Sequence, residues 1–293
     1  MTQILASLSE VAERYDTLFC DLWGCLHNGH APYPAAVSAL QAFRQKGGRV
    51  VLLTNAPRPS QFVMASLDRM GVPRDAWDLI VSSGDAAQYA MLSGAVGHRV
   101  WHLGPEKDDG FFKDLPADAP AAAITRVTLE EAEGIVCTGP FDEQTEVPED
   151  YRARLLHAKA RGLKLLCANP DIVVDYGDRR IYCAGAIAEL YSSMGGESLY
   201  FGKPHPPIYD LARRRLAALT GTEPDAGTIL AVGDGIATDI QGAIGEGIDA
   251  LFVTGGLAAD AFGPDVENPD PARLDAWLAA RQMSSAHAIG RLR

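Results

Sequence analysis

Residues 17–29, "TLFCDLWGCLHNG", decide the fold because they join a short apolar run to a turn built from small and polar residues. An apolar run of this length, bounded by turn signals, is typical of a buried strand. The run ends on one carboxylate, Asp21, and Trp23 stands two places later. We therefore expect a parallel strand that carries Asp21 at its carboxyl end.

The flanking sequence repeats the same unit, since apolar runs alternate with amphipathic helical patterns. Residues 34–47 and 59–71 have helical periodicity, whereas 49–56 and 79–84 are strand-like. This alternation predicts a parallel sheet with crossover helices. Three further strand and helix steps, which start near 198, 227 and 248, are expected to join the same sheet.

The middle of the chain is less regular and suggests a second domain inserted into the first. It contains acidic, proline-bearing stretches such as "GPFDEQTEVPED" at 139–150. A chain of 293 residues is long enough to bury two cores. The sequence predicts an α/β protein with a doubly wound parallel sheet, formed by 1–84 and 190–293, and an inserted α/β cap domain at 85–189. A last helix is expected within 268–283, and 284–293 is expected to fray.

Composition excludes several classes of protein. The formal net charge is -12 and the sequence has no run of Lys or Arg, which argues against binding to a nucleic-acid backbone. No apolar stretch of about 18 residues occurs, so we expect a cytoplasmic protein without membrane association. The five cysteines are an odd number without C-x-x-C spacing, and are expected to be reduced.

Polar side chains follow four of the predicted strands, where open parallel sheets bind their ligands. Two carboxylates close together repel each other unless a cation lies between them, and oxygen donors without His favour Mg²⁺. A magnesium ion, a lysine and a short polar side chain around one carboxylate would bind a tetrahedral dianion, and the carboxylate could attack its phosphorus. Each of these residues alone has another explanation, since the Asp, Thr and Asn side chains are compatible with a turn or a helix start and the lysine with an exposed surface position. The strand-end residues are Asp21, Thr54 with Asn55, Lys203, and Asp234 with Asp239.

Four ordered segments resemble the motifs of the haloacid dehalogenase (HAD) superfamily. They are "DLWGCLHNG" at 21–29, "VVLLTNAPR" at 50–58, "FGKPHPPIYDLA" at 201–212 and "AVGDGIATDIQGA" at 231–243. The long insertion and "CANPD" at 167–171 make the chain similar to the class IIA branch, which includes phosphatases of sugar phosphates and nitrophenyl phosphate.

The resemblance implies a role for each matching residue. Asp21 would be the nucleophile and a metal ligand, and Trp23 would offer its main-chain carbonyl to the metal. Thr54 and Asn55 would hold the phosphoryl oxygens, and Lys203 would balance charge. The remaining matches are Asp234 and Asp239 as metal ligands, and Asn169 and Asp171 in the cap as residues that contact the substrate.

Trp23 departs from the family pattern, because the family's phosphatases usually carry at this position an Asp that serves as general acid and base. An indole N–H cannot shuttle a proton to a leaving alkoxide. Three explanations are open: a residue such as His27 replaces the acid, the substrate has a good leaving group, or the site binds phosphate without turnover.

The sequence thus predicts a Mg²⁺-dependent hydrolase of a small phosphorylated metabolite that works through an aspartyl-phosphate on Asp21. The alternative is a weakly active or inactive protein that binds phosphate or a metabolite on the same scaffold. A nucleotide-dependent oxidoreductase is disfavoured, since no G-x-G-x-x-G follows the first strand. Dimers formed through the cap are common in the resembling branch, so a homodimer is compatible with it.

Overall fold

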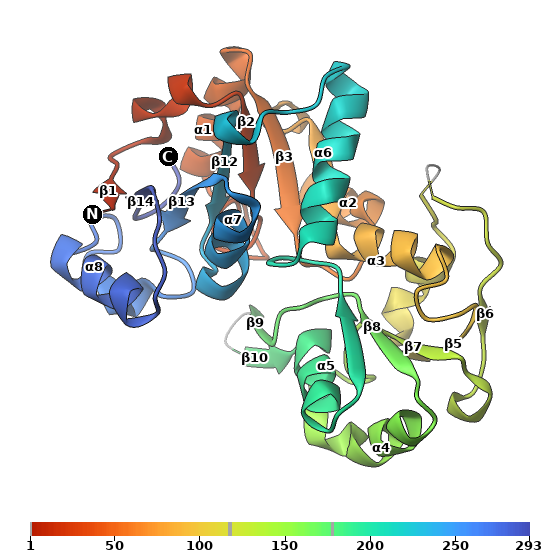
Figure 1. Cartoon of the computed structure of the whole chain (residues 1–293). Coiled ribbons are helices and arrows are strands. Elements are labelled where there is room, and N and C mark those ends of the chain that lie inside the picture. The colour runs from red at the N-terminus through yellow and green to blue at the C-terminus, as the bar shows by residue number, and fades with distance from the viewer. Residues whose placement is uncertain (1, 117–118, 177–178) are drawn as a thin grey trace. The chain divides into compact units, whose positions relative to one another are not determined.

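The computed structural model describes residues 2–116, 119–176 and 179–293 (Figure 1). Contacts divide the chain into two compact units, one of residues 1–54, 64–81 and 209–293, the other of 55–63 and 82–208. The strands are β1 Gln3–Ile4, β2 Thr17–Cys20, β3 Arg49–Thr54, β4 Leu79–Ser82, β5 Arg99–Leu103, β6 Thr125–Arg126, β7 Gly134–Cys137, β8 Lys164–Cys167, β9 Val173–Tyr176, β10 Arg179–Tyr182, β11 Glu197–Tyr200, β12 Ile229–Gly233, β13 Asp249–Val253 and β14 His287–Ile289. The α-helices are α1 Pro34–Gln45, α2 Ser60–Met70, α3 Ser83–Leu92, α4 Arg152–Ala160, α5 Ala184–Ser193, α6 Pro206–Thr220, α7 Gln241–Glu246 and α8 Pro271–Ala280.

The first unit is built on a seven-stranded sheet of order β1-β14-β13-β12-β2-β3-β4. The pairs from β1 to β3 are parallel. The chain moves outward from β2 through β3 to β4, and in the opposite direction from β12 through β13 to β14. Because crossovers between parallel strands are right-handed, this reversal places α1 and α7 on opposite faces. The prediction of a doubly wound α/β fold is confirmed, and its switch point lies between β2 and β12.

Local sequence explains why these elements form. Residues 50–54 of β3 are buried, as expected for a strand covered by helices on both faces. Helix α1 starts with a proline in its first turn, where the missing N–H costs no hydrogen bond. Its buried residues recur with helical spacing and form one face: Ala36, Val37, Leu40 and Phe43.

The second unit holds a five-stranded parallel sheet of order β11-β8-β7-β5-β6 and an antiparallel hairpin of β9 and β10. The prediction that the strand near 198 joins the first sheet is wrong, because β11 pairs with β8. Periodicity identifies a strand, but its neighbour is chosen by packing, and Leu199 packs on a core cluster of this unit. The domain limits at 85 and 189 remain predictions.

His102 on β5 should make the stability of the second unit depend on pH. Burial, and then the positive charge of Arg126, lower the pKa of His102 to about 4 from its usual 6.5. Above pH 6.5 the ring is neutral in both folded and unfolded chains, so the stability is complete there. As the pH falls from 6.5 towards 4, the unfolded chain binds the proton more readily, and stability is lost.

Between pH 7 and about pH 4.5 the free energy of unfolding of the wild type should fall. We expect this fall to be about 2 kcal/mol smaller in His102→Gln. Thermal or urea unfolding of both proteins at the two pH values measures this difference. The amide of Gln can still reach the Thr138 hydroxyl, which lies 3.0 Å from His102 Nε2. Equal acid sensitivity of the two proteins would rule out His102 as a source.

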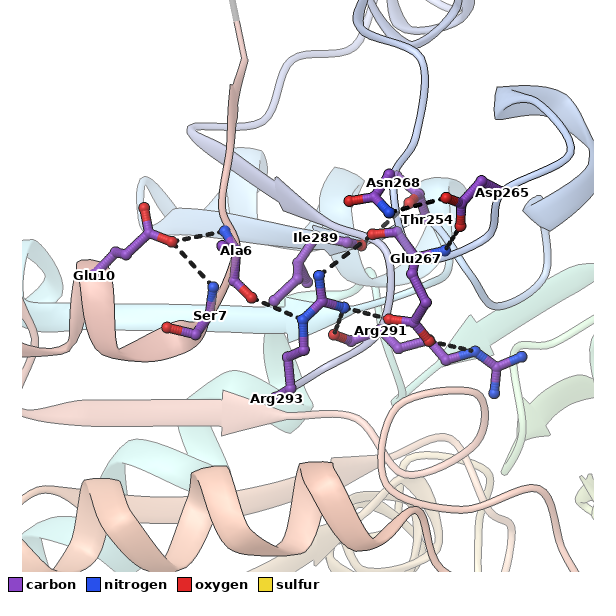
Figure 2. Close-up of polar contacts among 10 residues, drawn as sticks. All are labelled: Ala6, Ser7, Glu10, Thr254, Asp265, Glu267, Asn268, Ile289, Arg291 and Arg293. Atoms are coloured by element: carbon purple, nitrogen blue, oxygen red, sulfur yellow. Dashed lines mark hydrogen bonds and ion pairs between the residues drawn. The ribbon is translucent and has the colours of Figure 1, made fainter.

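The segment expected to fray, 284–293, is instead part of the first sheet. Strand β14 pairs in parallel with β13 on one side and with β1 on the other. Arg293 joins three segments, since its Nε donates to the carbonyl oxygen of Ala6 at 2.7 Å and its guanidinium forms an ion pair with Glu267 (Figure 2). The strand could not be predicted from this short segment, because its hydrogen-bonding partners lie far away in the sequence.

Arg293→Ala is expected to lower stability by about 1 kcal/mol, because it removes the partly exposed contacts of its guanidinium with Ala6, Glu267 and Arg291. This corresponds to a fall of roughly 2–4 °C in the thermal midpoint. Arg152→Ala is the matched control, since Arg152 pairs at the surface with Glu149 of the neighbouring turn. A midpoint no lower than that of the control would contradict the role of Arg293.

Two further features bear on the predictions from composition. Within the described residues, no helix is both long and apolar enough to cross a membrane. The five cysteines are free thiols, and all are buried.

Candidate active site

Three strand ends meet at the switch point of the first sheet. Asp21 follows β2 and Asp234 follows β12, while Thr54 is the last residue of β3. These strands are neighbours in the order β12-β2-β3, and the Asp21 N–H donates to the carbonyl oxygen of Val232 at 2.8 Å. All three polar residues are buried. The fold therefore places Asp21, Thr54 and Asp234 along one edge of the sheet.

Asp21 and Asp234 form a buried acidic cluster with Cys25. One ligand atom from each of the three residues lies within 4.8 Å of the others. Two buried carboxylates at this separation repel each other strongly unless a cation or a proton intervenes. Burial, followed by the negative charges of Asp234 and Asp21, raises the pKa of the Cys25 thiol well above its usual value. The donors available at neutral pH are therefore carboxylate oxygens, which fits Mg²⁺ and does not fit a thiolate-bound metal.

Glycines allow the main chain to approach the Asp234 carboxylate. A Cβ on Gly24, whose φ is +74°, would lie 2.1 Å from Asp234 Oδ2, and one on Gly256 would lie 2.0 Å from it. The N–H of Leu257 donates to the same oxygen at 2.9 Å. These three positions were missed from the sequence, although glycines next to strand ends are a signal for such close approach.

Asp239 holds the loop that carries Asp234. Its Oδ2 accepts a hydrogen bond from the Gly235 N–H at 3.0 Å, and a Cβ on Gly233 would lie 2.1 Å from its Cγ. The residue belongs to the π-helical turn Ile236–Ile240. This contact positions the loop, and a role of Asp239 as metal ligand stays a prediction.

Trp23 and His27 pack against each other within the loop after β2. The indole lies over Gly29, where a Cβ would come within 2.4 Å of Trp23 Cη2, and it meets the His27 ring edge-on at 5.3 Å between centroids. His27 Nδ1 accepts from the Gly29 N–H at 3.0 Å, and burial lowers the pKa of His27 to about 4. The ring is therefore neutral at pH 7, which disfavours it as the proton donor that replaces an Asp.

Asn55, Lys203 and Asp171 are brought together in the second unit. Asn55 Oδ1 accepts from the Lys203 N–H at 2.7 Å, and Asn55 Nδ2 donates to the Lys203 carbonyl oxygen at 3.0 Å. Nδ2 also donates to Asp171 Oδ1 at 2.8 Å. Asn55 and Lys203 are buried. An amide group has two hydrogens, so both side-chain donors of Asn55 are used here.

Asn169 lies in the same loop as Asp171 and shapes it. Its Oδ1 accepts from the Asp171 N–H at 3.0 Å, and its carbonyl oxygen accepts from the Cys167 thiol at 3.2 Å. The side chain of Asn169 is thus engaged in the loop itself. Contact of either residue with a substrate stays a prediction.

Comparison with known proteins identifies relatives of the chain. The family model described as haloacid dehalogenase-like hydrolase matches residues 18–115, and a HAD-hydrolase-like model matches 200–274. A solved hydrolase of the haloacid dehalogenase-like family from Brucella suis 1330 is 38% identical, with a TM-score of 0.83. The match covers 98% of this chain and 99% of that one.

The mycobacterial matches are more distant. The D-glycerol 3-phosphate phosphatase of Mycobacterium tuberculosis is 25% identical over 85% of this chain, which spans only 66% of that protein's length. A glycerol phosphate phosphatase from Mycobacterium tuberculosis, solved in complex with magnesium, is 26% identical with a TM-score of 0.64. That match covers 90% of this chain and 74% of the other.

Proposed function

Since this chain belongs to class IIA of the haloacid dehalogenase-like hydrolase family, we propose that it is a Mg²⁺-dependent phosphatase of a small phosphorylated metabolite. The observation that carries the proposal is the pair of buried carboxylates, Asp21 and Asp234, at the switch point of the sheet. The names of the mycobacterial relatives support phosphate esters as the substrate class. The bound magnesium of one relative supports the choice of metal.

In the proposed reaction, an Asp21 oxygen attacks phosphorus, and the bond from phosphorus to the ester oxygen breaks in line. The Thr54 hydroxyl donates a hydrogen bond to a phosphoryl oxygen, and Lys203 balances the negative charge. Asn55 is proposed to contribute through its main chain, since its side-chain donors are already used. The departing ester oxygen takes a proton from solvent. Water then attacks the phosphorus of the aspartyl-phosphate, the bond from phosphorus to the Asp21 oxygen breaks, and inorganic phosphate leaves with loss of a proton to solvent.

The residues that would hold Mg²⁺ are Asp21, Asp234 and the main-chain carbonyl of Trp23, with Asp239 as a further proposed ligand. When bound, the ion would neutralise charge that builds up on the phosphoryl oxygens. Asp239 would keep the Asp234 loop in place through Gly235. Asn169 and Asp171 remain proposed contributors to substrate choice, and a cytoplasmic location and a homodimer remain proposals from the sequence.

The test is release of inorganic phosphate from a panel of sugar phosphates, glycerol phosphates, pyridoxal phosphate, acyl phosphates and nitrophenyl phosphate. Each substrate is assayed with Mg²⁺ and with excess chelator. Release that requires Mg²⁺ supports the proposal and identifies the substrate class. Phosphate binding by calorimetry, without release from any member of the panel, would instead support the binding protein.

One observation favours the alternative, a protein that binds phosphate or a phosphorylated metabolite and hydrolyses it slowly or not at all. The position two residues after Asp21 carries an indole that packs on Gly29 and His27. Neither ring offers an acidic proton at neutral pH, so protonation of a poor leaving group lacks a donor from this loop. Acyl phosphates and nitrophenyl phosphate need no such donor and should be the best substrates of the panel.

Trp23→Asp is expected to increase phosphate release from sugar phosphates by about 10²-fold, the lower range of a positioned general acid. The matched control is Trp23→Asn, which opens the same space without a titratable group. Rates with acyl phosphates should change much less, because their leaving group is already stable. If Asp and Asn variants that remain folded have equal rates on sugar phosphates, a missing acid is not what limits the enzyme.

A further inference from the structure

The side chain of Asn55 forms hydrogen bonds with the main chain of Lys203, which lies 148 positions away in the sequence. Its oxygen accepts the N–H of Lys203 and its nitrogen donates to the carbonyl of the same residue. This two-point pairing fixes which end of the amide is oxygen, because the reverse orientation would oppose donor to donor and acceptor to acceptor. The amide of Asn55 therefore pairs with both main-chain polar groups of Lys203, as a residue of a neighbouring β-strand would.

Asp171 completes the arrangement. It accepts the second hydrogen of Asn55 Nδ2 at 2.8 Å, so the amide plane is held from two directions. Asn55 is buried, and a buried amide hydrogen without an acceptor would be destabilising. Asp171 thereby links the loop of residues 169–171 to Lys203 through one intervening side chain.

Two glycines allow the segments around Asn55, Asp171 and Lys203 to pack closely. A Cβ on Gly202 would lie 2.5 Å from Asn55 Oδ1 and 2.6 Å from Pro170 Cδ. A Cβ on Gly185, in the first turn of α5, would lie 2.2 Å from the Pro170 carbonyl oxygen. A side chain at position 202 would push the segment of Lys203 away from Asn55 and Pro170, and one at position 185 would displace the loop that carries Asp171.

The loop that carries Asn55 is also held from the side of α3. The Gly84 N–H donates to the Ala56 carbonyl oxygen at 3.0 Å, and a Cβ on Gly84 would lie 2.4 Å from the Pro57 carbonyl oxygen. Asp85 Oδ1 accepts from the Ser60 N–H at 2.8 Å. Asn55 therefore lies on a loop that is itself held by hydrogen bonds. Its two bonds to Lys203 thus restrict the position of the Lys203 main chain.

We infer that Asn55 and Asp171 are positioning residues that set the location of Lys203, with Asp171 acting through Asn55. The inference rests on the proposed function, in which the Lys203 ammonium balances the charge of the transferred phosphoryl group. A lysine side chain has several rotatable bonds, so the place of its ammonium depends on a fixed main chain. Asp171 then affects catalysis as the hydrogen-bond acceptor of Asn55 Nδ2.

The decisive comparison is Asp171→Ala against Asp171→Asn, measured on the best substrate of the panel. The Asn variant can still present an oxygen to Asn55 Nδ2, so its kcat should stay within about 3-fold of the wild type. The Ala variant should lose about 10-fold in kcat, with KM changed less, and Asn55→Ala should lose about 10²-fold. The double variant should be no slower than Asn55→Ala alone, since both act through one contact.

Two results would overturn the inference. Equal losses in Asp171→Asn and Asp171→Ala would mean that the charge of Asp171, and not its hydrogen bond to Asn55, is what catalysis requires. Losses that multiply in the double variant would mean that Asn55 and Asp171 act independently.

Hydrogen exchange separates this inference from the proposed function. The Lys203 amide donates to Asn55 Oδ1, so it should exchange slowly in the wild type and at least about 10-fold faster in Asn55→Ala. Absence of phosphate release by the wild type would count against the proposed function only. An unchanged Lys203 exchange rate in a folded Asn55→Ala variant would overturn the inference, whether or not the protein is active.

Discussion

Asp21→Asn is expected to lower Mg²⁺-dependent phosphate release by at least about 10⁴-fold, because an amide oxygen is a poor nucleophile at phosphorus. The substitution preserves the size of the side chain at the end of β2. Initial rates on the best substrate measure the effect. Denatured-protein mass spectrometry of quenched reactions should show a phosphoryl adduct on the wild type and none on the variant.

The matched control is Asp16→Asn, since Asp16 is exposed and lies directly before the other end of β2. Its rate should equal that of the wild type. If Asp21→Asn retained more than about one hundredth of the wild-type rate, the result would contradict a covalent role for Asp21. Water activated elsewhere would then have to attack phosphorus directly.

Asp234→Asn is expected to have opposite effects on stability and on metal binding. Without metal, the variant should be more stable than the wild type, since it removes one of two buried charges that repel each other. An Asn can still accept from the Leu257 N–H through its side-chain oxygen. With Mg²⁺, the wild type should gain about 2.7 kcal/mol at a free concentration 100 times its dissociation constant, and the variant much less.

Thermal unfolding with excess chelator and across a Mg²⁺ titration measures both effects, and phosphate release at each concentration gives the metal requirement. We expect the half-saturating Mg²⁺ concentration to rise by at least about 10-fold. Asp260→Asn, at an exposed position of the same unit, is the control. A destabilised metal-free variant with an unchanged Mg²⁺ response would place the metal away from Asp234.

Local patterns predicted which polar residues lie at the strand ends of the first sheet. Asp21, Thr54 and Asp234 each follow or end an apolar run, and the carboxyl ends of parallel strands meet at one edge of a sheet. Because strand periodicity depends on adjacent residues only, the positions of β2, β3 and β12 could be read before any contact was known. The role of Asn55 could not, since its three side-chain bonds reach residues 116 and 148 positions away.

Two strands show the same limit. Strand β11 has the apolar residues expected of any strand, and only packing against β8 assigns it to the second sheet. Strand β14 lies in the short segment "SSAHAIGRLR" at 284–293, where no periodicity signals a strand. It forms because β13 and β1 offer it backbone partners on both sides.

The sequence by itself determined the α/β class, the family and the strand-end residues of the candidate site, because these follow from short-range periodicity and from motifs in a fixed order. The tertiary structure decided what each side chain contacts: it buries Asp21 beside Asp234, folds the Trp23 indole onto Gly29, and commits the Asn55 amide to Lys203 and Asp171. Hydrogen bonds and charge repulsion act over a few ångströms in space, whereas the residues concerned lie up to 213 positions apart, the separation of Asp21 from Asp234. Distances of that kind are set only when the chain has folded.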